Sequence, residues 1–114
     1  KLALGPHAQT LFDEMLDAAD SQLYASTIIL AATIVDVALH ESEDDDEGFG
    51  LAYLTAPERK ALDWLRVRRN GLVHYEGVVS GMGKSEADKR LIADDAERAL
   101  QSLIPLMETL ENYS

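Results

Sequence analysis

The segment from Arg66 to Gly77, RVRRNGLVHYEG, holds the residue types in this chain that are best suited to phosphate chemistry. On a helix, Asn70 and His74 are four residues apart and share a face, and the long side chain of Arg69 can reach the same place. Arginine binds phosphate with a fork of N–H donors, and histidine transfers protons near neutral pH. The spacing therefore indicates a phosphodiester site. Its catalytic candidates are Arg69, Asn70 and His74, and its substrate-binding candidates are Arg66, Arg68 and Tyr75.

A second interpretation of the same segment stays open. The arginines could form a basic patch on the surface of a helical bundle, with His74 only capping the end of a helix. Gly71 bears on the choice, because glycine inside a helix costs about 1 kcal/mol relative to alanine. It would also let a ligand or another backbone come close.

Composition limits the possible classes of protein. The chain has 114 residues, the size of one domain, and it contains no cysteine, which excludes disulfides, thiol catalysis and Cys-based zinc sites. The net charge of −11 would repel nucleic acid overall, so any RNA contact must be local to the basic segment. We expect a cytoplasmic protein that needs no metal and no cofactor.

The elements that position this segment are four predicted helices, at about 7–19, 22–41, 55–75 and 86–112. Pro6 suits a first helical position, Asp20-Ser21 could cap the second helix, Thr55 and Glu58 form a capping box, and Ser85 is a further cap. Four helices without an internal repeat or a convincing strand predict one all-α, up-and-down four-helix bundle over residues 1–114. Pro105 should kink the last helix.

The predicted core follows the helical period of the apolar residues. The second helix is apolar on nearly every side, so several neighbours should cover it. Trp64 and Tyr53 are expected in the core or an interface. The other inward-facing residues are Ala8, Leu11, Phe12, Met15, Leu16 and Ala19 in the first helix, Leu62, Leu65, Leu72 and Val73 in the third, and Leu91, Ile92, Ala96, Ala99, Leu100, Leu103, Leu106 and Leu110 in the fourth.

Two connections and one apolar stretch resemble functional motifs but fail their tests. The acidic loop 41–54 lacks the final glutamate of an EF-hand, because Leu54 stands in its place. The Gly-rich loop 77–84 lacks the first glycine of a P-loop and has no strand before it. The apolar stretch 23–39 contains polar residues and is shorter than the ~20 residues of a membrane span. His7 and His40 are too far apart in sequence to suggest a site.

Asp36 is a single acid within the apolar second helix. Burying an unpaired carboxylate is costly, so we expect Arg66 or Arg69 to pair with it. The alternative is that Asp36 faces solvent at a gap in the bundle.

Residues 69–74, RNGLVH, resemble the Arg-x4-6-His motif of HEPN domains, and Asp36 stands where the central helix of these domains often carries an acid. The resemblance implies a helical bundle that dimerises and brings two motifs into one cleft. It implies a metal-independent endoribonuclease of a toxin–antitoxin or phage-defence system, in which Arg69 holds the scissile phosphate, His74 is the general base or acid, and Asn70 positions one of them.

One departure from the family pattern concerns the partner. HepT-type toxins have a tyrosine two places after the histidine, where an antitoxin modifies it, but here Glu76 occupies that place and Tyr75 is one place early. Glu76 would also repel RNA. A non-catalytic HEPN module that binds nucleotide or a partner protein, and a purely structural dimerisation bundle, therefore stay open as alternatives.

Overall fold

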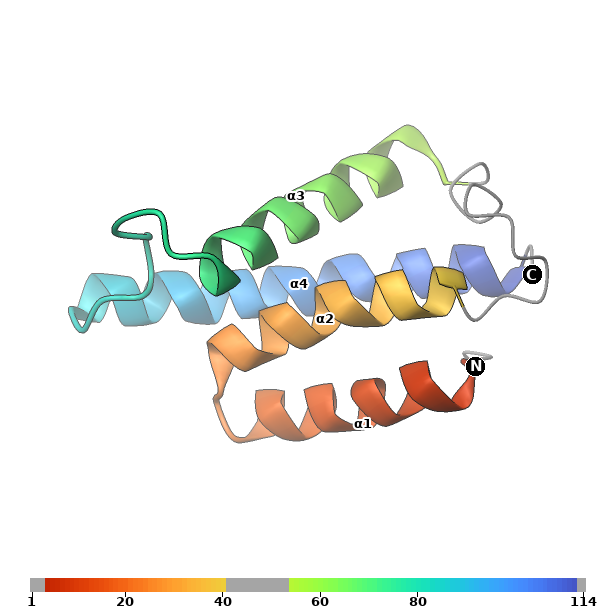
Figure 1. The fold of residues 1–114 in the computed structure, drawn as a ribbon, viewed down its shortest axis with the longest axis horizontal. Helices are drawn as coiled ribbons and strands as arrows, with labels where there is room; N and C mark the ends of the chain where they lie inside the picture. Colours follow the sequence, from red (N-terminus) through yellow and green to blue (C-terminus); the bar gives the residue numbers. More distant parts are fainter. Residues whose placement is uncertain (1–3, 41–53, 113–114) are drawn as a thin grey trace.

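The computed structural model describes residues 4–40 and 54–112, with side chains as far as Thr109, and forms four helices in this part of the chain. They are α1 (Pro6–Asp20), α2 (Tyr24–His40), α3 (Ala56–Val73) and α4 (Glu86–Asn112). Consecutive helices run in opposite directions, and α2 lies between the others and contacts all three (Figure 1). The predicted all-α bundle is confirmed, and the four helix ranges differ from the predicted ones by at most a few residues.

Three of the predicted helix starts are confirmed. Pro6 opens α1. At α3, the Thr55 hydroxyl accepts from the backbone N–H of Glu58 (3.3 Å), and the Glu58 carboxylate accepts from the N–H of Thr55 (2.9 Å). At α4, the Ser85 hydroxyl accepts from the N–H of Asp88 (3.0 Å). These side chains satisfy backbone donors that the first turn of a helix leaves unpaired.

The predicted cap of α2 is wrong. Ser21 is the C-cap of α1, and the chain then turns through Gln22, whose φ is +60°. The N–H groups of Gln22 and Leu23 donate to the carbonyls of Ala19 (3.1 Å) and Ala18 (2.8 Å). This pair of bonds is a Schellman motif, which usually has glycine at the left-handed position.

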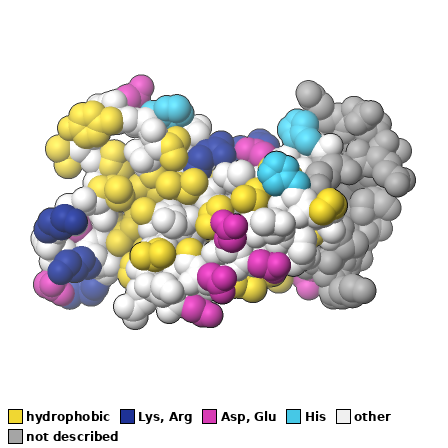
Figure 2. Space-filling view, turned by 60° about the horizontal axis from the view of Figure 1, so that its bottom comes forward, with side chains coloured by type: hydrophobic (Ala, Val, Ile, Leu, Met, Phe, Trp, Pro, Cys, Tyr) yellow, Lys and Arg dark blue, Asp and Glu magenta, His cyan; other side chains and the backbone are white. Residues whose placement is uncertain are grey.

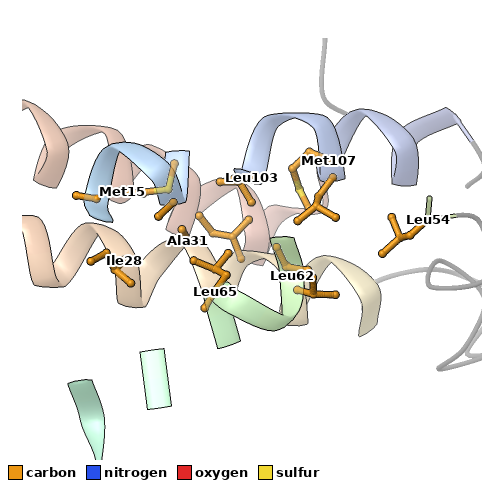
Figure 3. Close-up of a cluster of buried hydrophobic side chains, with 14 of the residues drawn as sticks. Met15, Ile28, Ala31, Leu54, Leu62, Leu65, Leu103 and Met107 are labelled. Carbon is orange, nitrogen blue, oxygen red and sulfur yellow. The ribbon is translucent and has the colours of Figure 1, made fainter. Parts of the chain in front are cut away.

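The core lies between the four helices and includes Leu54 from the segment before α3. Side chains from each element point toward one another in Figure 3. Leu54 is 8% exposed, so the end of the predicted solvated loop 41–54 is part of the core, while residues 41–53, including Tyr53, lie outside the described residues. α2 contacts the other three helices. This packing outweighs the preference of its β-branched residues for strands. Fully burying one large aliphatic side chain contributes about 1.5–3 kcal/mol.

The buried polar group in the described core is satisfied. Thr27 is fully buried, and its hydroxyl donates to the backbone carbonyl of Leu23 (2.9 Å). Trp64 is half-buried against the core, as predicted, and the guanidinium carbon of Arg98 lies 4.0 Å from the centre of its ring. That contact joins α3 to α4 by a cation–π interaction. α4 continues as a helix through Pro105.

Three residues that were predicted to face inward are exposed: Leu16, Val73 and Leu91. All three lie near one end of the bundle, where the α1–α2 turn and the connection 74–85 are found, and α1 packs mainly on α2 there. Because α1 has α2 as its main neighbour, part of the apolar stripe of α1, including Leu16, is left uncovered. Figure 2 shows hydrophobic side chains gathered at this end of the molecule.

Candidate active site

Asp36 of α2 joins two arginines of α3. Its Oδ1 atom accepts from Arg66 Nη2 (2.8 Å) and Nε (3.2 Å), and its Oδ2 atom accepts from Arg69 Nη1 (3.3 Å). The predicted ion pair is therefore confirmed, with both candidate arginines bound instead of one. The three side chains are 21–35% exposed, so the cluster lies at the edge of the bundle between solvent and core.

Arg69 also positions its neighbour in the motif. Its Nε–H donates to Oδ1 of Asn70 (3.0 Å), which fixes the orientation of the Asn70 amide. A continuous polar contact thus runs from Asp36 through Arg69 to Asn70. Asn70 in turn contacts the end of the helix, because its backbone carbonyl accepts from the N–H of His74 (3.1 Å).

His74 is the C-cap of α3 and is exposed. It borders a surface hollow of about 470 Å³, which we call the His74 hollow. Its described lining residues are Val67, Asn70, Gly71, His74 and Glu76. Apart from the two chain neighbours and the helix's own backbone, no atom of the described residues lies within 4 Å of the place that a Cβ on Gly71 would take, so this part of the hollow has room for a ligand.

The structure brings the three catalytic candidates together only in part. Asn70 and His74 share the hollow, and Arg69 contacts Asn70, but Arg69 is not among the residues that line the hollow. Its guanidinium is directed to Asp36 instead. Their catalytic roles stay predictions.

The substrate-binding candidates lie in three different settings. Tyr75 is 85% exposed directly after His74. Arg66 is bound to Asp36. Arg68 is turned away to α4 and the following loop: its Nε donates to Asp95 Oδ2 (2.9 Å) and its Nη2 to the backbone carbonyl of Ser80 (2.7 Å). Contact of any of the three with a substrate stays a prediction.

Two carboxyl groups at helix starts have shifted pKa values. The backbone hydrogen bond from Thr55, followed by that from the Thr109 hydroxyl (2.7 Å), lowers the pKa of Glu58. The Ser85 hydroxyl, followed by the backbone N–H of Gly81, lowers the pKa of Asp88. Hydrogen bonds to the charged form stabilise it. Both carboxylates therefore stabilise the starts of their helices, and neither lines the His74 hollow.

A second hollow was missed from the sequence. His7, Asp36, Val37 and His40 line a space of about 400 Å³, and Nδ1–H of His40 donates to the backbone carbonyl of Asp36 (2.7 Å). Figure 2 shows two histidine side chains close together at the end of the bundle opposite the hydrophobic surface. Because antiparallel neighbours place the start of one helix beside the end of the next, the predicted topology was a signal that could have paired His7 with His40.

Within residues 4–40 and 54–112, no group of three or more His, Asp or Glu side chains is arranged to hold a metal ion. No helix in the same part of the chain is long and apolar enough to cross a membrane.

No protein-family model matches the chain, and comparisons with curated proteins and with solved structures found no match.

Proposed function

We propose that the chain is a HEPN-like endoribonuclease that cuts RNA without a metal ion, with its cleft formed between two copies. The observation that carries this proposal is the line of contacts from Asp36 through Arg69 and Asn70 to the hollow beside His74. It places a cation, an amide and an imidazole along one edge of the bundle. Cleavage of a phosphodiester without a metal ion can use these three groups: the cation stabilises the phosphate charge, the amide orients an oxygen, and the imidazole transfers protons.

The proposed reaction is an attack of the ribose 2′-hydroxyl on the adjacent phosphorus. The imidazole of His74 takes the proton of the 2′-hydroxyl, the O2′–P bond forms, and the P–O5′ bond breaks. The 5′ oxygen receives a proton from the second copy of His74, which starts the step as an imidazolium and ends it as a neutral imidazole, and the products are a 2′,3′-cyclic phosphate and a 5′-hydroxyl. Arg69 stabilises the negative charge of the phosphoryl oxygens, and Asn70 orients the attacking or leaving oxygen.

The second copy is part of the proposal because the reaction uses one His74 as the base and another His74 as the acid. The apolar side chains on either side of His74 are exposed: Val73 by 45%, Tyr75 by 85% and Val78 by 99%. A partner surface would bury them, since soluble proteins rarely leave contiguous apolar patches uncovered.

The decisive experiment is cleavage of a mixed RNA pool by the purified protein in EDTA. His74→Ala and Arg69→Ala are compared with His7→Ala and Arg90→Ala, which change the same residue types elsewhere. General acid–base catalysis contributes about 10²–10⁴-fold, so His74→Ala should lower the rate by that factor while both controls cut normally. A folded, dimeric wild type that does not cut RNA would refute the nuclease proposal.

A second candidate function is a non-catalytic module that binds nucleotide or a protein partner. The observation that favours a protein partner is the position of Glu76, which lines the same hollow as His74. A carboxylate there repels a phosphate. Glu76→Gln separates the nuclease from a module that binds a cationic protein: in a nuclease it should tighten RNA binding by about two- to five-fold at low salt, whereas a site for a cationic protein should lose affinity for that partner.

A further inference from the structure

The connection between α3 and α4 is fixed to the bundle at two points, and Arg68 makes the first. Its guanidinium bridges Asp95 of α4 and the backbone carbonyl of Ser80. The side chains of Arg68 and Asp95 are only 13% and 19% exposed, compared with 35% and 32% for Arg66 and Asp36. A charged pair that is largely shielded from water and bonded in two directions holds its geometry better than an exposed pair does.

The second point is Gly81, directly after Ser80. Gly81 is buried with φ +90°, and its N–H donates to Asp88 Oδ1 (2.9 Å). A Cβ on Gly81 would lie 2.9 Å from Arg68 Nη2 and 3.4 Å from the backbone N of Ile92. The glycine therefore lies closely packed between the Arg68 guanidinium and α4, and its positive φ favours glycine over other residues.

Between the end of α3 and Ser80 lie six residues, which we call the 74–79 segment. It starts at His74, includes Glu76 of the hollow, and turns at Gly77, whose φ is +125°. Most of this segment is exposed and contributes little to the core. Its position is therefore determined by its two ends, and the Arg68 bonds fix the distal one.

We propose that Arg68 is a positioning residue: by holding Ser80 and Gly81 against Asp95, it sets the place of the 74–79 segment and so of His74 and Glu76 in the hollow. The expected effect of Arg68 on RNA cleavage rests on the proposed function. The expected effect of Arg68 on the position of the 74–79 segment is independent of that function.

The test compares the wild type with Arg68→Lys and Asp95→Asn, using Arg90→Lys on the exposed side of α4 as the control. Lysine keeps the charge but lacks the fork that reaches two acceptors. Hydrogen–deuterium exchange is measured along the chain. The hydrogen-bonded amides of the connection, those of Gly81 and Met82, should exchange roughly ten-fold faster in both variants, the factor expected for the loss of one charge-assisted hydrogen bond, while α1 and α2 keep the wild-type pattern.

Exchange that stays at the wild-type rate at Gly81 and Met82, or that rises equally in all four helices, would overturn the proposal. The RNA arm measures kcat and KM for the same proteins. Mispositioning of His74 should lower the kcat of Arg68→Lys about ten-fold or more with little change in KM, and an unchanged kcat would overturn the catalytic part. If the wild type does not cut RNA, the proposed function fails, and the exchange measurement still decides whether Arg68 positions the segment.

Discussion

Replacing Asp36 by asparagine removes the charge that holds Arg66 and Arg69 and keeps the size of the side chain. Three hydrogen bonds to a carboxylate are lost or weakened, at 2.8, 3.2 and 3.3 Å. Fully exposed ion pairs contribute about 0.2–1 kcal/mol, and breaking a buried pair costs about 3–5 kcal/mol. Since the Asp36 side chain is 32% exposed, we expect a loss of about 1–2 kcal/mol in the free energy of unfolding.

The assay is unfolding by heat and by urea, followed by far-UV circular dichroism. A chain of 114 residues has an unfolding entropy of about 0.24 kcal/mol/K near its midpoint, so the melting temperature of Asp36→Asn should fall by about 4–8 °C. Asp94→Asn, which removes the same charge from the exposed face of α4, is the control. In 1 M salt the difference should shrink, because the cluster is partly open to solvent.

A double-mutant cycle with Arg66→Met isolates the pair itself. The coupling energy between Asp36 and Arg66 should be about 1 kcal/mol, since the two side chains share two hydrogen bonds. A coupling near zero, or a melting temperature of Asp36→Asn that equals the Asp94→Asn value, would refute the view that this cluster fixes α3 on α2.

Three further predictions concern helix ends and glycines. The backbone hydrogen bond of its capping box lowers the pKa of Glu58 below the usual 4.5. The contribution of Glu58 to the free energy of unfolding is therefore present above pH 4.5 and is lost as the pH falls through the lowered pKa. Urea titrations at pH 7 and pH 3 should show a smaller pH effect on that free energy in Glu58→Gln than in the wild type. Gln22→Gly should raise the free energy of unfolding by about 0.5 kcal/mol in thermal melts, because Gln22 has a φ of +60° and glycine adopts that conformation without strain; a melting temperature below the wild-type value would contradict this. Gly81→Ala should lower the free energy of unfolding by about 1–3 kcal/mol, because the new Cβ meets Arg68 and Gly81 has a positive φ. Gly71→Ala, with open space around the new Cβ, should instead raise the free energy of unfolding by up to about 1 kcal/mol. Equal effects at the two glycines would refute the packing argument.

Local signals in the sequence were enough to predict the helices and most of their starts. The Thr55–Glu58 box and the Ser85 cap depend on residues three apart, and the structure confirms both. The pairing of Asp36 with α3 followed from the cost of a lone carboxylate in an apolar helix. Each of these predictions needed only neighbouring residues or one strong energetic penalty.

The remaining features depend on contacts between distant residues. Arg68 was predicted to bind substrate, yet its observed partners are Asp95 and Ser80, which are 27 and 12 residues away. The exposure of Leu16 depends on how much of α1 its neighbours cover, which the helical period does not specify. The hollow shared by His7 and His40 likewise exists only after α1 and α2 pack side by side.

The contact between Trp64 and Arg98 gives the molecule an optical reporter of its own. Trp64 is the one tryptophan in the 114 residues, and the Arg98 guanidinium lies 4.0 Å from its ring centre. Indole emission responds to a nearby cation and to the entry of water, so any change in the spacing of α3 and α4 should alter the fluorescence. Arg68 and Asp95 join the same two helices. A change in the spacing of α3 and α4 can therefore be followed in the unlabelled protein, in real time.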